Sequence, residues 1–168
     1  MNIREEVASD IDKIWKVNSD AFETEAEANL VNALRNSGCT YLSLVAETEN
    51  KVVGHILFTP VELCGNNNNL RIMGLAPMAV LSKYQNKGIG SKLVQAGLER
   101  CRSLGYDAVV VLGHPNYYPN FGFVPSVKYG IKSEYEVPDE VFMILELIPG
   151  SLKNHGGVIK YHEAFNSV

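Results

Sequence analysis

The sequence predicts a mixed α/β fold, a mostly antiparallel sheet with one parallel strand pair and flanking helices. Short apolar runs separated by polar turns follow one another early in the chain and indicate antiparallel strands. A later segment repeats its apolar residues every three to four positions and separates two such runs, which indicates a strand, a helix and a parallel strand. The chain has 168 residues, 46% of them hydrophobic and 20% charged, enough for one ordinary core.

The first elements are a strand at 2–7 and two amphipathic helices. Ser9 is expected to cap the first helix, because the apolar residues from Ile11 to Phe22 recur at threes and fours after it. The second helix is expected over 25–36, with Gly38 just beyond its end. The order is therefore strand, helix, helix.

Three strands follow, at 41–46, 51–61 and 71–81. The polar residues at 47–50 suit a hairpin turn, and the asparagine-rich segment Asn66–Asn69 suits an exposed turn before the third strand. Consecutive strands with short connections are most economically antiparallel.

The best-defined helix is expected over 86–103. The apolar run 108–112 is short and uninterrupted, as in a strand buried on both faces, and we expect it to lie parallel to the strand before the helix. Turn residues then lead to a last strand at 141–147, and the tail from Pro149 is expected to add a short strand or to pack as a lid.

Composition excludes several classes of protein. The net charge of −4 provides no global field to attract nucleic acid or an anionic membrane, so neither is expected as a partner. The three cysteines lie far apart without metal-ligand spacing, so we expect reduced thiols and no metal site. The N-terminus lacks the pattern of a signal peptide, and no run approaches the roughly 20 apolar residues of a membrane span. The expected location is cytoplasmic.

The segment that carries chemistry runs from a strand through a polar turn into the long helix. Gly88 and Gly90 stand where the helix begins, so backbone amides from Lys87 to Ser91 can hold two phosphates, helped by the side chains of Gln85 and Lys92 and that of Lys87 itself. The spacing of a nucleoside-triphosphate loop is absent, and so is the third glycine of a dinucleotide fingerprint. Alternatively, the glycines only shape a helix end.

Two motifs resemble those of one superfamily. Gln85-x-x-Gly88-x-Gly90, between an apolar strand and a helix, is similar to the pyrophosphate signature of the GNAT superfamily of acyl-CoA-dependent N-acetyltransferases. Tyr118, followed by Gly-Phe at 122–123, matches the later Tyr-x-x-x-Gly-Phe of that superfamily. The local sequences look most like a subgroup of small bacterial acetyltransferases.

The resemblance implies a GNAT-like fold in a single N-acetyltransferase domain over 1–168, with 149–168 as a C-terminal extension that packs on it. It also implies acetyl-CoA as the acyl donor, with the pantetheine arm between the two parallel strands where they splay apart. The backbone at 78–80 would meet the pantetheine. The implied cofactor contacts are Met78, Ala79, Val80, Gln85, Asn86, Lys87, Gly88, Ile89, Gly90, Ser91 and Asn116.

The same resemblance puts Tyr118 in the position of the general acid, with Tyr117 as the alternative. A phenol of pKa about 10 holds its proton more firmly than a thiol of pKa about 8.5, so in the ground state it stays protonated and can hydrogen-bond the sulfur of the leaving thiolate as charge develops there. No carboxylate lies between Arg71 and Val80, where several relatives hold a base. The candidates for a base are therefore His114, then Glu62 and His55, although a structural role suits either histidine and a water molecule can relay the proton.

The leading hypothesis is transfer of acetyl from acetyl-CoA to a primary amine of a small molecule, peptide or protein, by direct attack in a ternary complex. One alternative is a catalytically silent acyl-CoA-binding sensor or regulatory module, and another is a phosphate-binding module unrelated to CoA. The acceptor is expected to meet the loop at 22–27 and the loop after Phe123. The sequence leaves a homodimer open.

Overall fold

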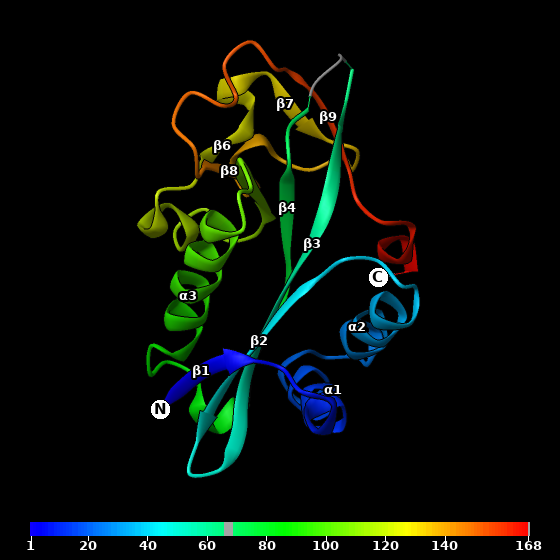
Figure 1. Ribbon diagram of the computed structural model, residues 1–168, viewed down its shortest axis with the longest axis vertical. Coiled ribbons are helices and arrows are strands. Elements are labelled where there is room, and N and C mark those ends of the chain that lie inside the picture. The colour runs from blue at the N-terminus through cyan, green and yellow to red at the C-terminus, as the bar shows by residue number, and fades with distance from the viewer. Residues whose placement is uncertain (66–68, 168) are drawn as a thin grey trace. The chain divides into compact units, whose positions relative to one another are not determined.

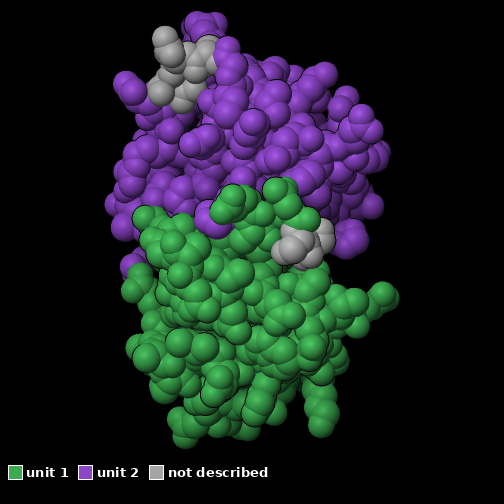
Figure 2. Space-filling model, turned by 90° about the vertical axis from the view of Figure 1, so that its right-hand side faces the viewer, with its two compact units in different colours: residues 1–59, 76–97, 163–168 green, residues 60–75, 98–162 purple. Residues whose placement is uncertain are grey.

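The structure is a computed structural model that describes residues 1–65 and 69–167, and Figure 1 names its helices and strands. The described chain forms two compact units, coloured separately in Figure 2. One comprises residues 1–59, 76–97 and those from 163 onward, and the other comprises residues 60–75 and 98–162. The turn expected at Asn66–Asn69 falls mainly on residues 66–68, which lie outside the described residues.

Two antiparallel pairings lie in the first unit, and the one between the strands predicted at 41–46 and 51–61 is confirmed. β1 pairs with β2, with Asn2 opposite Glu47, and β2 pairs with β3. The turn between β2 and β3 consists of Glu49 and Asn50, whose φ angles are 50° and 62°. Two positive φ angles give a turn whose twist matches that of the adjoining strands. The strands are β1 (Asn2–Glu5), β2 (Leu42–Thr48), β3 (Lys51–Cys64) and β4 (Ile72–Val80), the last two shared with the second unit.

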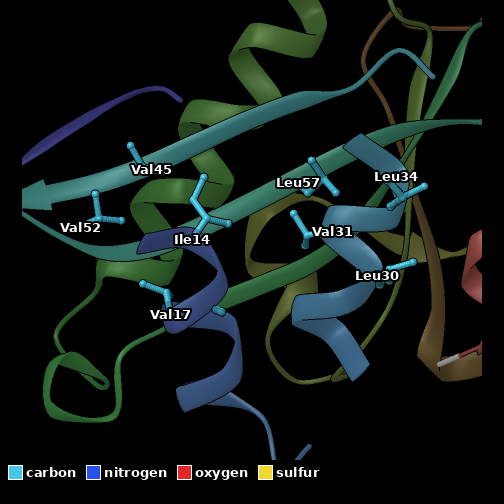
Figure 3. Close-up of a cluster of buried hydrophobic side chains, with 9 residues drawn as sticks. Ile14, Val17, Leu30, Val31, Leu34, Val45, Val52 and Leu57 are labelled. Carbon is cyan, nitrogen blue, oxygen red and sulfur yellow. The ribbon is translucent and has the colours of Figure 1, made fainter. Parts of the chain in front are cut away.

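The core of the first unit lies between two helices and the sheet (Figure 3). Helices α1 (Ile11–Ala21) and α2 (Ala26–Asn36) bury side chains three or four residues apart, which is the periodicity that predicted them. These side chains pack against β2, β3 and β4. The buried cluster comprises Ile14, Val17, Leu30, Val31, Leu34, Val45, Val52, Leu57 and Ala79.

The start of α1 differs from the expected one. Ser9 lies within a 3-10 turn, Ala8–Asp10, that precedes the helix, so the prediction that it caps the helix is wrong. The carboxylate of Asp10 instead accepts the Val7 N–H at 2.8 Å and a guanidinium N–H of Arg4 at 2.7 Å. Asp10 is 1% exposed, and its bond to Arg4 lowers the pKa of its carboxyl. A buried carboxylate needs such partners, so the acidic residue organises this turn.

Close packing at Gly97 of helix α3 (Ile89–Ser103) yields a stability prediction. A Cβ at this position would overlap Cε1 of the fully buried Phe58. We expect Gly97→Ala to lower the free energy of unfolding by about 1–2 kcal/mol, because overpacking costs more than the gain in helix propensity. Urea unfolding measures this, with Gln95→Ala on the exposed face of α3 as the control. A Gly97→Ala protein at least as stable as the wild type would contradict it.

The second unit contains the parallel strand pair that the sequence predicts. β4 pairs in parallel with β5 (Ala108–Leu112) through Ile72–Gly74, and β8 (Phe142–Glu146) pairs antiparallel along the whole of β5. The first four residues of β5 are buried, but Leu112 is 45% exposed, so burial on both faces ends one residue early. From Leu75 onward β4 extends beyond this parallel pairing.

The tail contributes a strand to the second unit, as expected. β9 (Gly157–Lys160) pairs antiparallel with the end of β3 and parallel with β7 (Ile131–Ser133). The sequence predicts neither β7 nor the two-residue β6 (Val124–Pro125), because segments this short show no alternation of apolar and polar residues. The core of this unit comprises Val61, Ile72, Ala108, Val110, Ile131, Phe142, Ile144, Leu152 and Ile159.

Candidate active site

The glycine loop lies in the first unit, between β4 and α3. A 3-10 turn, Ser82–Tyr84, follows β4, and α3 begins only at Ile89 rather than at Asn86 as expected. The later start has a local cause, since Asn86 and Gly88 have φ angles of 62° and 83°, which no α-helix contains. The chain therefore turns twice through the left-handed region before the helix begins.

Backbone amides at the start of α3 form a site for an anion. The first hydrogen bond of the helix runs from the Lys92 N–H to the Gly88 carbonyl at 3.1 Å, so the amides of Ile89 and Gly90 precede the helical ladder. They stand at the positive end of the helix dipole. Gly88 is exposed, and an added Cβ would meet nothing within 4 Å, so this helix end is open to a ligand. Such a helix end can hold phosphate oxygens.

Two side chains form hydrogen bonds that hold the first part of the loop. The Gln85 amide donates Nε2–H to the Val80 carbonyl at 3.0 Å, so this side chain, expected to bond a phosphate, also closes the loop. The carboxylate of Asp20 accepts the Ser82 N–H at 2.7 Å and the Ser82 Oγ–H at 2.9 Å. These bonds lower the pKa of the Asp20 carboxyl, the backbone bond most strongly.

Lysines gather at an aromatic ring beside the loop. The Nζ atoms of Lys51 and Lys87 each lie 5.8 Å from the centre of the Tyr84 ring, within the range of a cation–π contact. The sequence predicts Lys87 near a phosphate. It does not predict that Lys51, at the start of β3, lies at the same ring. Positive charge therefore collects beside the open helix end.

The second half of β4 alternates buried and half-buried residues. Ala79 is buried in the first core, whereas Met78 and Val80 are half-buried, as the alternation of a strand requires. Pro77 is buried, and the Ala76–Pro77 peptide bond is cis. Proline offers no N–H to a ladder, which agrees with its place beyond the end of the parallel pairing.

Tyr118 lies in the second unit, in a 3-10 helix, Tyr118–Phe121, that follows β5. Its ring makes edge contacts with Tyr117 and Phe123, with centroids 5.1 Å and 5.7 Å away, and a Cβ on Gly113 would overlap it. Tyr118 is 8% exposed, and this burial raises its pKa to about 12. Its phenol therefore carries a proton at neutral pH.

Further predicted site residues are exposed, in contrast to the buried Tyr118. His114 and Asn116 are exposed, and the His114 carbonyl accepts the N–H of Tyr117 at 3.1 Å and of Tyr118 at 3.3 Å. These bonds hold both tyrosines in the turn. Glu62 is exposed on β3, directly opposite Lys160 of β9.

His55 is a structural residue, so it is removed from the candidate bases. It is fully buried in the first unit, with Nδ1 3.1 Å from the Asn18 Nδ2 and Nε2 2.9 Å from the Ser43 Oγ. Burial lowers its pKa from 6.5 to about 3. A ring bonded on both nitrogens in a core cannot meet an acceptor amine.

The buried His55 makes stability depend on pH. In the unfolded chain a histidine takes up a proton as the pH falls below about 6.5, whereas the folded protein resists protonation down to about 3. Its contribution is therefore complete above pH 6.5 and is lost as the pH falls, by up to about 1.4 kcal/mol per unit. Urea unfolding at pH 7.5, 6 and 5 measures the free energy of unfolding. Between these pH values it should fall less steeply for His55→Gln than for the wild type. Identical slopes would contradict this.

Two absences hold for residues 1–65 and 69–167. No group of three or more His, Cys, Asp or Glu side chains there could hold a metal ion. In the same part of the chain, no helix has the length and apolar character needed to cross a membrane.

The parallel pair of β4 and β5, with the glycine loop and α3 between them in the chain, is the arrangement expected of a GNAT-like acyl-CoA-dependent N-acetyltransferase. The model of the acetyltransferase (GNAT) family matches residues 6–123, which include the glycine loop and the Tyr118 turn. The chain belongs to this family and is an acyl-CoA-dependent N-acetyltransferase.

Similar proteins agree with this assignment. The uncharacterized N-acetyltransferase YhbS of Escherichia coli K12 is 36% identical over 167 residues, 99% of each chain, and YjhQ of the same organism is 41% identical over 135 residues, 79% of this chain and 75% of that protein. The crystal structure of Escherichia coli YhbS in complex with CoA is similar with a TM-score of 0.92 at 36% identity, covering 98% of this chain and 91% of that one. A GNAT family acetyltransferase from Brucella melitensis in complex with acetyl-CoA gives a TM-score of 0.79 at 34% identity, covering 98% and 97%.

Proposed function

We propose that this acetyltransferase binds acetyl-CoA at the start of α3 and transfers its acetyl group to a primary amine of a small molecule, peptide or protein. The observation that carries the proposal is the open helix end at Gly88, where backbone amides precede the helical hydrogen bonds and two lysines lie at the neighbouring Tyr84. The structures of two relatives, one with CoA and one with acetyl-CoA, support the same ligand here.

Each part of the cofactor contacts its own segment of the chain. The diphosphate accepts hydrogen bonds from the amides of residues 87–91, with Asn86 and Gly88 shaping the turn. The pantetheine arm runs along the backbone of Met78, Ala79 and Val80, where one amide donates to the thioester oxygen. Asn116 is a further pantetheine contact. Residues 78–80 lie beyond the last pair of the parallel ladder with β5, at Gly74, which supports this placement of the pantetheine arm.

The reaction is a direct attack in a ternary complex. The amine nitrogen adds to the thioester carbonyl carbon, and the carbon–sulfur bond breaks with its electron pair on sulfur. Burial keeps the phenol of Tyr118 protonated, so it can hydrogen-bond the sulfur and give up its proton as charge develops there, and the phenolate then recovers a proton from water. The proton lost by the amine goes to His114 or to water, so CoA thiol and an amide leave the site.

The proposal treats residues 1–168 as one N-acetyltransferase domain acting in the cytoplasm. The extension at 149–168 supports this through β9, which pairs with β3, and through Phe165, which packs against the core of the first unit. The segment therefore contributes packing to the same fold.

The test is the release of CoA thiol from acetyl-CoA in the presence of polyamines, amino acids, aminoglycosides and peptides. We expect saturable release with at least one primary amine, and formation of the acetylated amine by mass spectrometry. A tertiary amine, which cannot form a neutral amide, is the matched control. Saturable binding of acetyl-CoA without release above background for any amine would instead indicate a sensor and would contradict the proposal.

A further inference from the structure

A hydrogen-bonded contact far from the cofactor motif in sequence sets the start of the glycine loop. Asp20 stands in the last turn of α1, and its carboxylate oxygen Oδ2 accepts both the backbone N–H and the hydroxyl of Ser82, at 2.7 Å and 2.9 Å. Both residues belong to the first unit. We propose that Asp20 is a positioning residue for the cofactor loop, an inference that rests on the proposed binding of acetyl-CoA there.

The bonds around Ser82 explain how its position reaches the loop. Leu81 donates its N–H to the Val53 carbonyl at 2.9 Å, and Tyr84 donates to the Leu81 carbonyl at 2.8 Å, which closes the turn. Gln85 then bonds back to Val80 through its side chain. A short closed turn has few ways to bend, so the orientation of the Ser82 N–H fixes the direction in which the chain enters the left-handed residues before α3.

The carboxylate is held by a helix with a fixed position. Ile14 and Val17 of α1 are 0% and 1% exposed in the core, so the last turn of this helix has a rigid support. Asp20 itself is exposed and, like any exposed aspartate, ionised at neutral pH; the bonds from Ser82 lower the pKa of its carboxyl further. An ionised acceptor makes stronger hydrogen bonds than a neutral one. The core thus aims a charged acceptor at the first residue of the turn.

The experiment measures acetyl-CoA binding by calorimetry for variants at the two ends of this contact. Asp20→Ala is expected to raise the Kd about fivefold to tenfold, because two bonds to a charged acceptor are lost. Asp20→Asn keeps an oxygen for the Ser82 N–H and should raise it about threefold, and Ser82→Ala, which keeps the backbone bond, about twofold. In the Asp20→Ala background, Ser82→Ala should add nothing, since the acceptor is already gone.

A KM-against-kcat comparison separates positioning from general damage. For Asp20→Ala, kcat and the KM for the amine at saturating acetyl-CoA should stay within twofold of the wild type, whereas the KM for acetyl-CoA rises. The matched control is Asp12→Asn, which removes an exposed carboxylate from the same helix and should leave the Kd unchanged. An Asp20→Ala protein that binds acetyl-CoA as tightly as the wild type would overturn the inference and leave the proposed function intact.

A second readout does not need the cofactor. Amide hydrogen exchange at residues 84–90 of the unliganded protein should accelerate several-fold in Asp20→Ala and not in Asp12→Asn. If the wild type failed to bind acetyl-CoA, the proposed function would fail, and this readout would still decide whether Asp20 orders the loop. Unchanged exchange in Asp20→Ala would overturn the positioning role.

Discussion

Replacing Tyr118 by phenylalanine should lower kcat for acetyl transfer by about 100-fold or more, with the Kd for acetyl-CoA within about twofold of the wild type. The phenol is the buried, protonated group of the 3-10 turn, and its ring is held by Tyr117 and Phe123. Phenylalanine keeps that packing and removes only the proton donor. The loss should therefore fall on the chemical step, which steady-state kinetics and calorimetry measure together.

The neighbouring tyrosine is the matched control for this prediction. Tyr117 packs edge-on against the same ring but is half-buried, so Tyr117→Phe should retain at least about a third of the kcat. Because the pKa of Tyr118 is about 12, the wild-type rate should not fall from loss of its proton between pH 7 and 10. Full turnover in Tyr118→Phe, or a larger loss in Tyr117→Phe, would assign the general acid elsewhere.

Placing an aspartate at Gly88 should weaken acetyl-CoA binding by about 100-fold, because the carboxylate would stand within several ångströms of the diphosphate. Gly88 has a φ of 83° and open space around it, so the side chain fits without a clash. A negative charge at the start of α3 also favours the helix dipole. Binding should therefore fall far more than stability does. The melting temperature should drop only slightly, because the left-handed φ strains any L residue here, and Gly88→Asn should show a similar drop.

Asparagine at the same position isolates the effect of charge. Gly88→Asn has almost the same shape as Gly88→Asp and tolerates the left-handed conformation about as well. We expect its Kd for acetyl-CoA, measured by calorimetry, to rise by no more than about fivefold. Equal losses in the two variants would mean that the backbone conformation matters and that no phosphate lies near this residue.

Much of the fold was predictable because its signals are local. The apolar period of α3, the uninterrupted run of β5 and the polar hairpin at Glu49–Asn50 each depend on residues close in sequence, and each prediction is confirmed. The start of α3 was placed three residues early, because the left-handed Asn86 is not distinguished from a helical residue by hydrophobic pattern.

Parts of the candidate site could not be predicted, since they depend on contacts between distant residues. Nothing in the local sequence connects Asp20 to Ser82, which lie 62 positions apart, or shows that the Gln85 side chain turns back onto Val80. His55 is a candidate base from the sequence alone, because the residues next to it in the chain do not reveal that the folded protein buries it completely. The glycine motif was predictable because its function depends on backbone geometry, and a left-handed position such as Gly88 favours glycine in the sequence.

The central claim is that the amides at the start of α3 bind the diphosphate of CoA. Its most direct test is a crystal structure of the protein grown with acetyl-CoA. We expect diphosphate oxygens about 2.7–3.2 Å from backbone nitrogens of residues 87–91, and the thioester beside the backbone of residues 78–80. A bound cofactor whose diphosphate lies elsewhere, with that helix end empty, would contradict the account.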